Sequence, residues 1–336
     1  MTQAGKILTK IINAVSVDEE HNVFHLNKPV GRATKDSNKN NSVINDLAEI
    51  IYSNYYITGG VPGNNKLKPK PGKNKLPNAL NFTNELKRAY TLNRSLDNGW
   101  NAVERDSNGT IYAQKYDEII QLRPGQFIWK ENRNGNYYGK NLSPYIPELK
   151  QPGLEYFYFV RANVPFDSVN AQLARFYFNL HPKGAPLAIK EITAEFNEFG
   201  IPFLFKCSGN PSNFRRTDNS VLYIENCYVN ISLQLLRKIV SHLKPFLKTT
   251  VPLFALKLFN GFSFAENPTD GNSFGMNRSL LIADGIAEAI HKKRNKKLWL
   301  SFMLKHINKS GYSVNEMYRN PGPAYPYDFS MFTDEK

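Results

Sequence analysis

The sequence predicts an α+β fold, a mixed sheet with flanking helices, over the C-terminal two-thirds of the chain, together with a mainly helical N-terminal part. Three observations support this prediction. Residues 174–181 alternate between polar and apolar side chains, which is typical of a half-buried strand whose polar side chains share one face. Residues 186–199 then place apolar side chains at helical spacing, and the apolar run 201–207 follows at once. The order strand, helix, strand indicates a sheet covered by helices.

The N-terminal part of the chain predicts helices followed by a small β segment. Apolar residues recur at helical spacing through the first 60 residues, and a further helix is expected at about 81–92. Short apolar runs separated by Gly and Asn predict short strands within residues 107–139. We therefore divide the chain into residues 1–150, with a candidate role in peptide binding or docking, and an α+β domain at residues 151–336.

The pattern changes at about residue 152, where the apolar runs become longer and strands alternate with helices. Gly200 stands where a helix C-terminal cap is expected, so the helix at 186–199 should end there. We expect further strands at 154–163, 220–226 and 251–259, and further helices at 232–247 and 277–293.

The chain is strongly basic, with 43 Lys and Arg against 29 Asp and Glu, a net charge of +14 and a pI near 9.5. Such a charge attracts nucleic acid, an anionic membrane, a phosphopeptide or an acidic protein, and charge alone does not choose among them. We interpret the basic runs 64–75 and 291–297 as exposed, solubilising charge. Residues 59–79 have little to bury, so we expect a loop there.

Several classes of protein are disfavoured. No apolar run reaches the length of a membrane span, and the first 21 residues do not resemble a signal peptide. Two cysteines suit a reducing compartment, so we expect a cytoplasmic protein, with a secreted effector as the alternative. The six histidines lack the spacing of metal ligands, and no nucleotide-binding, kinase, serine-hydrolase or zinc-protease motif is present. We therefore expect no metal and no cofactor.

Basic residues stand on predicted strands beside aromatic residues, and Lys206 is the most informative of them. It lies between "FLF" and "CSGN" at a strand end. Aromatic neighbours and nearby guanidinium groups disfavour its charged form, and a neutral amine is what a general base requires. The alternative is a lysine that extends its ammonium group into solvent. The other members of this basic group are Arg175, Lys257, and the loop residues Arg215 and Arg216.

Residues 267–290 have the composition of an anion site. Asp270, Asn272 and Ser273 are candidate N-caps of the helix that follows, and Arg278 lies near its first turn. Exposed backbone amides beside an arginine suit phosphate, although an ordinary capped helix with a surface arginine explains the same residues. His181 is the one histidine next to the basic group, and a structural role is its alternative to catalysis.

Four segments, which recur in order over about residues 150–328, together resemble the HopA-type type III effector family. Members of that family outside pathogens include the lyase components of class V lanthipeptide and thioamitide biosynthesis. The segments are "RFYFNLHPKGAP", "IPFLFKCSGNPSNFRRTDNSVLYI", "PLFALKLFNGFSFAENPTDGNSFGMNRSLLIADGI" and "NPGPAYPYDF".

The family is distantly similar to phosphothreonine lyase effectors, and this likeness implies roles for several residues. Lys206 matches the base, and Tyr177 occupies the position of the acid, where the remote relatives have histidine; His181 is the reserve acid. Adjacent cations should lower the pKa of Tyr177 and make it a better acid. The residues expected to bind the substrate phosphate are Arg175, Arg215, Arg216, Lys257 and Arg278.

The resemblance implies a phosphothreonine or phosphoserine lyase that eliminates phosphate from a phosphorylated precursor peptide and leaves a dehydroamino acid. No kinase motif is present, so we expect a separate kinase to supply the substrate. The alternative is a non-enzymatic, effector-like module that binds a phosphorylated partner or a kinase. A nucleic-acid binder driven by charge is a third, less favoured hypothesis. The lyase hypothesis requires Lys206 and Tyr177 to lie on the same side of the sheet.

Overall fold

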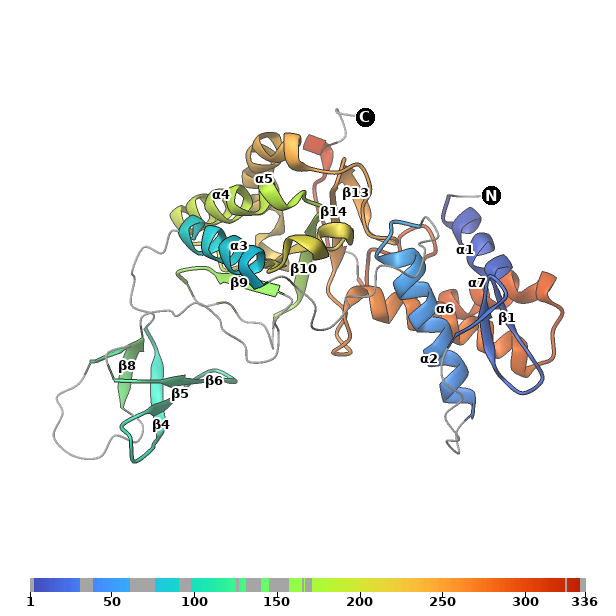
Figure 1. Ribbon diagram of the computed structural model, residues 1–336, viewed down its shortest axis with the longest axis horizontal. Helices are drawn as coiled ribbons and strands as arrows, with labels where there is room; N and C mark the ends of the chain where they lie inside the picture. Colours follow the sequence, from blue (N-terminus) through green and yellow to red (C-terminus); the bar gives the residue numbers. More distant parts are fainter. Residues whose placement is uncertain are drawn as a thin grey trace.

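The computed structural model describes residues 3–30, 39–60, 76–90, 98–124, 127–130, 140–144, 157–164, 166, 171–323 and 325–332. At its centre lies a six-stranded antiparallel sheet in the order β13-β14-β10-β12-β11-β9 (Figure 1). Helices flank this sheet, so the predicted α+β fold is confirmed. The strands are β9 (Phe157–Arg161), β10 (Leu173–Phe178), β11 (Leu204–Ser208), β12 (Ser220–Glu225), β13 (Leu256–Phe259) and β14 (Phe262–Glu266).

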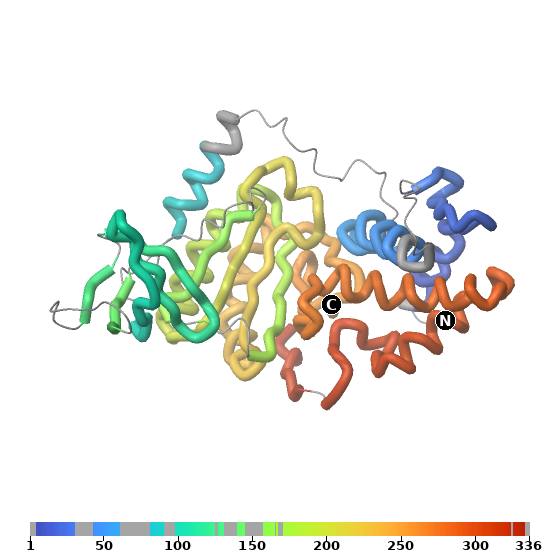
Figure 2. The backbone as a smooth tube through the Cα atoms, turned by 90° about the horizontal axis from the view of Figure 1, so that it is seen from below, coloured from blue at the N-terminus to red at the C-terminus, as the bar shows by residue number. Residues whose placement is uncertain are grey.

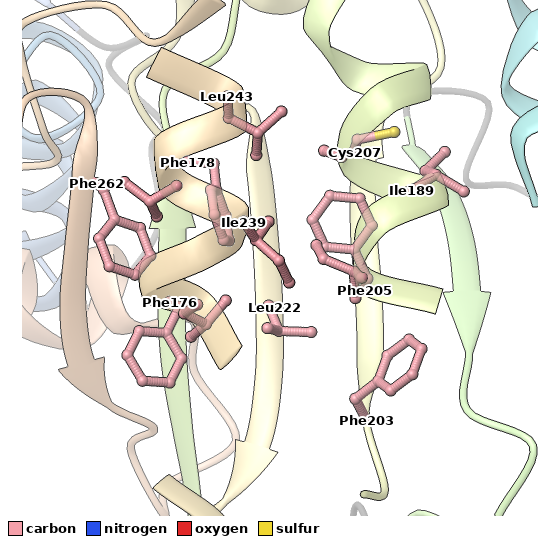
Figure 3. Packing of buried hydrophobic residues seen from close by; sticks show 14 of the residues in the cluster. Phe176, Phe178, Ile189, Phe203, Phe205, Cys207, Leu222, Ile239, Leu243 and Phe262 are labelled. Atoms are coloured by element: carbon pink, nitrogen blue, oxygen red, sulfur yellow. The ribbon is translucent and has the colours of Figure 1, made fainter. Parts of the chain in front are cut away.

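One face of the sheet is apolar and is covered by α4 (Ala185–Glu198) and α5 (Val229–Leu243). Phe176 and Phe178 project from β10 into this layer and are fully buried. Figure 3 shows them beneath the two helices, together with Phe205 of β11. The alternate residues of each strand reach this face because successive side chains of a strand point to opposite sides. The main hydrophobic core therefore lies between the sheet and these helices, and α3 (Leu76–Ala89) packs beside α4.

The opposite face is covered in part by α6 (Phe274–His291) and by α2 (Lys39–Ile51), which continues into the π-helical turn η1 (Tyr52–Tyr56). Tyr177 of β10 lies in a second core with residues of these helices. All six residues of β10 are consequently buried. This strand differs from the half-buried strand expected from its alternation, because η1 and α6 cover its polar side.

Helices from the two ends of the chain share this second core. α1 (Gln3–Ala14) and α2 pack with α6 and with α7 (Trp299–Lys309), as Figures 1 and 2 show. A small antiparallel sheet follows α1 and contains β1 (Val15–Val17), β2 (Val23–His25) and β3 (Lys28–Val30). The first helices of the chain thus pack against its last ones, and a domain boundary near residue 150 stays a prediction.

A third sheet stands apart from the central one in Figure 1. Its antiparallel strands follow the order β6-β5-β4-β8-β7, and they enclose a small core of their own that includes Trp100, Ile111 and Leu142. It confirms the short strands expected in this region. The strands are β4 (Trp100–Arg105), β5 (Ile111–Lys115), β6 (Glu118–Leu122), β7 (Phe127–Trp129) and β8 (Asn141–Pro144).

Most predicted elements of the C-terminal part are confirmed, with one clear difference. The strand expected at 251–259 begins only at Leu256, because a turn precedes it in which Phe254 has a φ of 73°. The basic run 64–75 and most of the loop expected at 59–79 lie outside the described residues, but the end of that loop is helical, since α3 begins at Leu76. Short helical turns complete the chain: η3 (Pro182–Gly184), η4 (Pro211–Arg215), η5 (Asn226–Tyr228), η6 (Lys244–Phe246), η7 (Lys296–Leu298) and η8 (Ser330–Phe332). No helix among the described residues is both long and apolar enough to span a membrane.

Candidate functional site

Strand register brings three of the predicted site residues to one face of the central sheet. Lys206 on β11 and Tyr177 on β10 both lie directly opposite Val221 of the intervening strand β12. Residues directly opposite each other in an antiparallel pair project to the same face. Arg175 shares the parity of Tyr177 and lies opposite Tyr223. Lys206, Tyr177 and Arg175 therefore lie on the same side of the sheet, as the lyase hypothesis requires.

Tyr223 stands between the two cations of this face. The Nζ atom of Lys206 lies 5.4 Å from the centre of the Tyr223 ring, and Cζ of Arg175 lies 5.1 Å from the same ring. Lys206 also lies 4.8 Å above the ring of Phe157. Burial alone would raise the pKa of Tyr223, but Arg175 and Lys206 outweigh burial and lower this pKa below its ordinary value. Tyr223 is therefore a more acidic phenol than usual, next to an amine.

Arg175 is buried but has hydrogen-bonding capacity to spare. Its Nε donates to Oδ1 of Asn267 at 2.6 Å. No hydrogen bond from its two Nη nitrogens is found within the described part of the chain, and the Tyr177 phenol lies close by. Burial would lower the pKa of Arg175, but Tyr223 and Tyr177 raise it, so the guanidinium remains charged. A buried cation with free donors suits an oxyanion.

Tyr177 does not match the acid expected from the sequence. Its side chain is 1% exposed, and its hydroxyl has no hydrogen-bond partner among the described residues. Burial raises the pKa of Tyr177 to about 12, in spite of the opposing effect of Arg175. The expectation that neighbouring cations would lower this pKa is wrong, because desolvation of the phenolate outweighs their attraction. The ring of Phe274 on α6 lies 6.2 Å from the Tyr177 ring, centre to centre.

Arg216 forms an ion pair with Asp218. Its Nε and Nη2 each donate to one oxygen of Asp218 at 2.8 Å, and Nη2 also donates to the Tyr52 hydroxyl at 2.7 Å. Burial would raise the pKa of Asp218, but Arg216 and, more weakly, Lys206 lower it. Arg216 therefore neutralises a carboxylate that faces Lys206, while Arg215, at the end of η4, is the exposed arginine of the two.

Arg278 is structural, contrary to the phosphate-binding role expected for it. It is fully buried on α6, and Nε donates to the Met317 carbonyl at 2.7 Å. Nη2 donates to the Arg319 carbonyl at 2.8 Å, and Nη1 to the side chains of Asn277 and Tyr312. These bonds fix the C-terminal segment to α6 and leave no donor for a substrate. Ser273 is the N-cap of this helix, and its hydroxyl accepts from the Met276 amide.

Two further predicted residues lie away from Lys206. Lys257 is on the edge strand β13, four strand spacings or roughly 19 Å from Lys206, and its Nζ donates to Asn260. It lines a cavity of about 390 Å³ beside Val314–Tyr318. His181 is exposed, and its Nδ1 accepts a hydrogen bond from the Lys183 amide, which caps η3. The structure thus favours the structural alternative for His181.

Sequence reasoning missed Tyr223 and Asp218. Tyr223 belongs to the run "SVLYIEN", which predicts a strand but does not reveal which strands lie on either side. Its position between Arg175 and Lys206 follows from the pairing of β12 with both β10 and β11. Asp218 follows Arg216 by two residues, and that spacing was the available signal for their ion pair. No group of three His, Cys, Asp or Glu residues suited to a metal ion occurs within the described ranges.

The chain is similar to a known protein family and to solved structures. The HopA1 effector protein family matches residues 149–319, just over half of the chain. Similar solved structures include those of two effector proteins from Pseudomonas syringae. The effector from pv. tomato strain DC3000 is 14% identical, with 96% of this chain and 100% of that chain covered and a TM-score of 0.49. The effector from pv. syringae strain 61 is 13% identical, with 86% and 100% covered and a TM-score of 0.43. No curated protein matches the chain. Given the extent of the family match, the chain belongs to the HopA1 effector protein family.

Proposed function

We propose that this protein is a phosphothreonine or phosphoserine lyase that eliminates phosphate from a phosphorylated peptide and leaves a dehydroamino acid. The observation that carries the proposal is the grouping of Lys206, Tyr223 and Arg175 on one sheet face, where an amine, an acidic phenol and an arginine with free donors lie together. Family membership and the resemblance to lyase components support the same reaction. A separate kinase would supply the phosphorylated peptide.

Each residue of the group has a task in this reaction. Arg175 binds the phosphate through its Nη nitrogens, and the exposed Arg215 is available on the solvent side. Lys206 removes the proton from Cα through its amine nitrogen, and the electron pair of that bond forms the Cα–Cβ double bond. The Cβ–O bond breaks, and Tyr223 donates its proton to the departing phosphate oxygen. We favour Tyr223 over Tyr177 as acid because Tyr177 is buried and its pKa is raised to about 12.

Negative charge lies next to the Lys206 amine in the proposed reaction, and neighbouring cations balance it. A phosphate dianion and the Asp218 carboxylate both favour the protonated form of a nearby amine. Arg216 is bonded to both oxygens of Asp218, and Arg175 would neutralise part of the phosphate charge. These two cations would thus balance the negative charge next to the Lys206 amine.

The burial of Tyr177 also favours a second function, a module that binds a phosphorylated partner or kinase without reaction. In this case the residue at the position of the acid has lost contact with the substrate, and Arg175 alone holds the phosphate. The two functions make opposite predictions for the fate of the phosphopeptide.

Incubation with a library of phosphothreonine peptides separates the two functions. Without added metal, the lyase should produce peptides that have lost phosphoric acid, detected by mass spectrometry. Lys206→Ala should lower the rate by about 10²–10⁴-fold, the usual contribution of a positioned base. Lys257→Ala, which removes a lysine from the same face of the sheet but from its far edge, serves as the matched control and should retain the rate. Binding without mass loss would favour the second function, and an unchanged rate in Lys206→Ala would exclude this lysine as the base.

A further inference from the structure

A hairpin of the small sheet reaches the side of the candidate site. β5 and β6 form this hairpin, and Oε1 of Glu118 on β6 lies 2.6 Å from Nη1 of Arg161 on β9. Arg161 lies opposite Leu204, which in turn lies opposite Tyr223. Arg161 therefore projects from the same face, and in the same row, as Tyr223 and Arg175. The small sheet lies on the side of the central sheet away from α4 and α5 in Figure 1, and the Glu118–Arg161 pair places the end of its hairpin beside β9.

The tip of the hairpin carries an exposed aromatic residue in an unusual backbone conformation. Tyr116 is 67% exposed and has a φ of 54°, in the left-handed region that favours glycine or asparagine at hairpin turns. Ile119, three residues later, is 59% exposed. Neither side chain contributes to the small core of this sheet. A bulky residue at position 116 therefore does not help the hairpin to fold. An exposed tyrosine there is explained if it contacts a bound partner.

The ion pair to Arg161 positions the hairpin more than it stabilises the fold. Its side chains are 26% and 37% exposed, and exposed ion pairs contribute little to stability. Its effect is to hold the hairpin tip at the border of the face that carries Lys206. Arg161 lies two strand spacings from Tyr223, roughly 10 Å. An extended peptide covers that distance in about three residues.

We infer that the β5–β6 hairpin, with Tyr116 at its tip, binds the peptide segment that flanks the phosphorylated residue, about three positions away. The inference rests on the proposed function and names its recognition element. The occupant is an extended peptide rather than a small molecule, because Arg161, which holds the hairpin, lies two strand spacings from Tyr223, the proposed acid. An exposed aromatic side chain at the tip suits an apolar residue in that segment.

Two ligands of different length test the inference. The first is a set of long peptides with a central phosphonate analogue of phosphothreonine, which lacks the Cβ–O bond and cannot undergo elimination. The second is the same phosphonate residue with blocked termini. Both are measured by calorimetry on the full chain. Tyr116→Gly suits the left-handed backbone, so this variant should keep its melting temperature; Tyr116→Ala is the second variant.

We expect Tyr116→Gly and Tyr116→Ala to bind the best long peptide about ten-fold more weakly than the wild type, and the blocked residue equally well. Ile128→Ala, which truncates an exposed residue on the other edge strand of the same sheet, should change neither affinity. Equal loss for both ligands, or unchanged peptide affinity in both Tyr116 variants, would overturn the inference and leave the proposed function standing. A wild type that binds neither ligand would overturn the proposed function, and the inference with it.

Discussion

The two faces of the central sheet are built from the same strands but bury different chemistry. On one face, Phe176 and Phe178 of β10 pack beneath α4 and α5 among apolar side chains. On the other, Arg175 and Tyr177 of the same strand are enclosed by η1 and α6, and Tyr223 and Lys206 lie on the next two strands, β12 and β11. Burying a guanidinium and a phenol is costly, so the second face is poorly explained by stability.

The contrast separates two kinds of contribution. Substitutions on the apolar face should lower stability and affect activity only through unfolding. Substitutions on the polar face should affect the reaction more than the fold, except where a buried charge loses its partner. Four variants test this division, in order of decreasing expected effect.

Phe176→Ala should give the largest loss of stability. The side chain is fully buried and stacks on Phe262 with a centroid separation of 5.7 Å. Truncation of a buried phenylalanine leaves a cavity and costs about 3–5 kcal/mol in the free energy of unfolding. Urea denaturation followed by circular dichroism measures this change. Phe199→Ala is the control, since Phe199 is 59% exposed and its loss should cost less than about 0.5 kcal/mol.

Asp218→Asn should cost about 3 kcal/mol, because it leaves the Arg216 guanidinium without its carboxylate. The pKa of Asp218 is lowered in the fold, so its contribution is present above the unfolded value of about 3.9 and is lost as pH falls through the lower folded value. The wild type should thus lose stability in this acidic range, and Asp218→Asn should lose less. Glu195→Gln, which breaks the exposed pair with Lys238, is the control and should cost less than about 1 kcal/mol. Equal losses in the two variants would contradict a special role for the buried pair.

Tyr223→Phe should lower the elimination rate by about 10²-fold while changing stability little. The acid must be protonated, so the wild-type rate should fall as pH rises through the pKa of Tyr223, which lies below the ordinary value of about 10. The variant should lack this alkaline decline. The rates of the wild type and the variant are measured on the best peptide of the library from pH 6 to pH 10, in steps of about one pH unit. A variant that keeps the decline would assign the acid to another group.

Gly275→Ala should have the smallest effect among the three variants that act on the free energy of unfolding. A Cβ atom at this position on α6 would lie 2.3 Å from Cε1 of Tyr56, so the ring on η1 must move. Overpacking of this kind costs about 1–3 kcal/mol in the free energy of unfolding. Ser279→Ala, on the same helix, removes a buried hydroxyl that has no partner among the described residues and serves as the control. Thermal melts of both variants would show whether close contact between η1 and α6 is required.

The sequence predicted the elements of the C-terminal part well because their periodicities are strong. The alternation of residues 174–181 and the helical spacing of residues 186–199 both correspond to elements in the structure. What the alternation could not reveal is whether a second layer covers the polar side. That layer comes from η1 and α6, which are far from β10 in the sequence, so β10 is buried on both faces.

The candidate site was predicted only in part, for reasons of pairing and burial. Lys206 and Arg175 were identified from basic residues on aromatic strands, and the register places them on one face. Arg278 was misjudged because the segment that accepts its hydrogen bonds lies about 40 residues further along the chain. Tyr177 was misjudged because its cationic neighbour was foreseen and its burial was not.

The central claim is that the face with Lys206, Tyr223 and Arg175 breaks the Cβ–O bond of a phosphorylated residue. The most direct measurement follows the products in water enriched in the heavy isotope of oxygen. Elimination predicts inorganic phosphate without the heavy isotope, together with an equal amount of dehydroamino acid in the peptide. Phosphate that carries the heavy isotope, with an intact hydroxyl residue left in the peptide, would show hydrolysis at phosphorus and contradict the account.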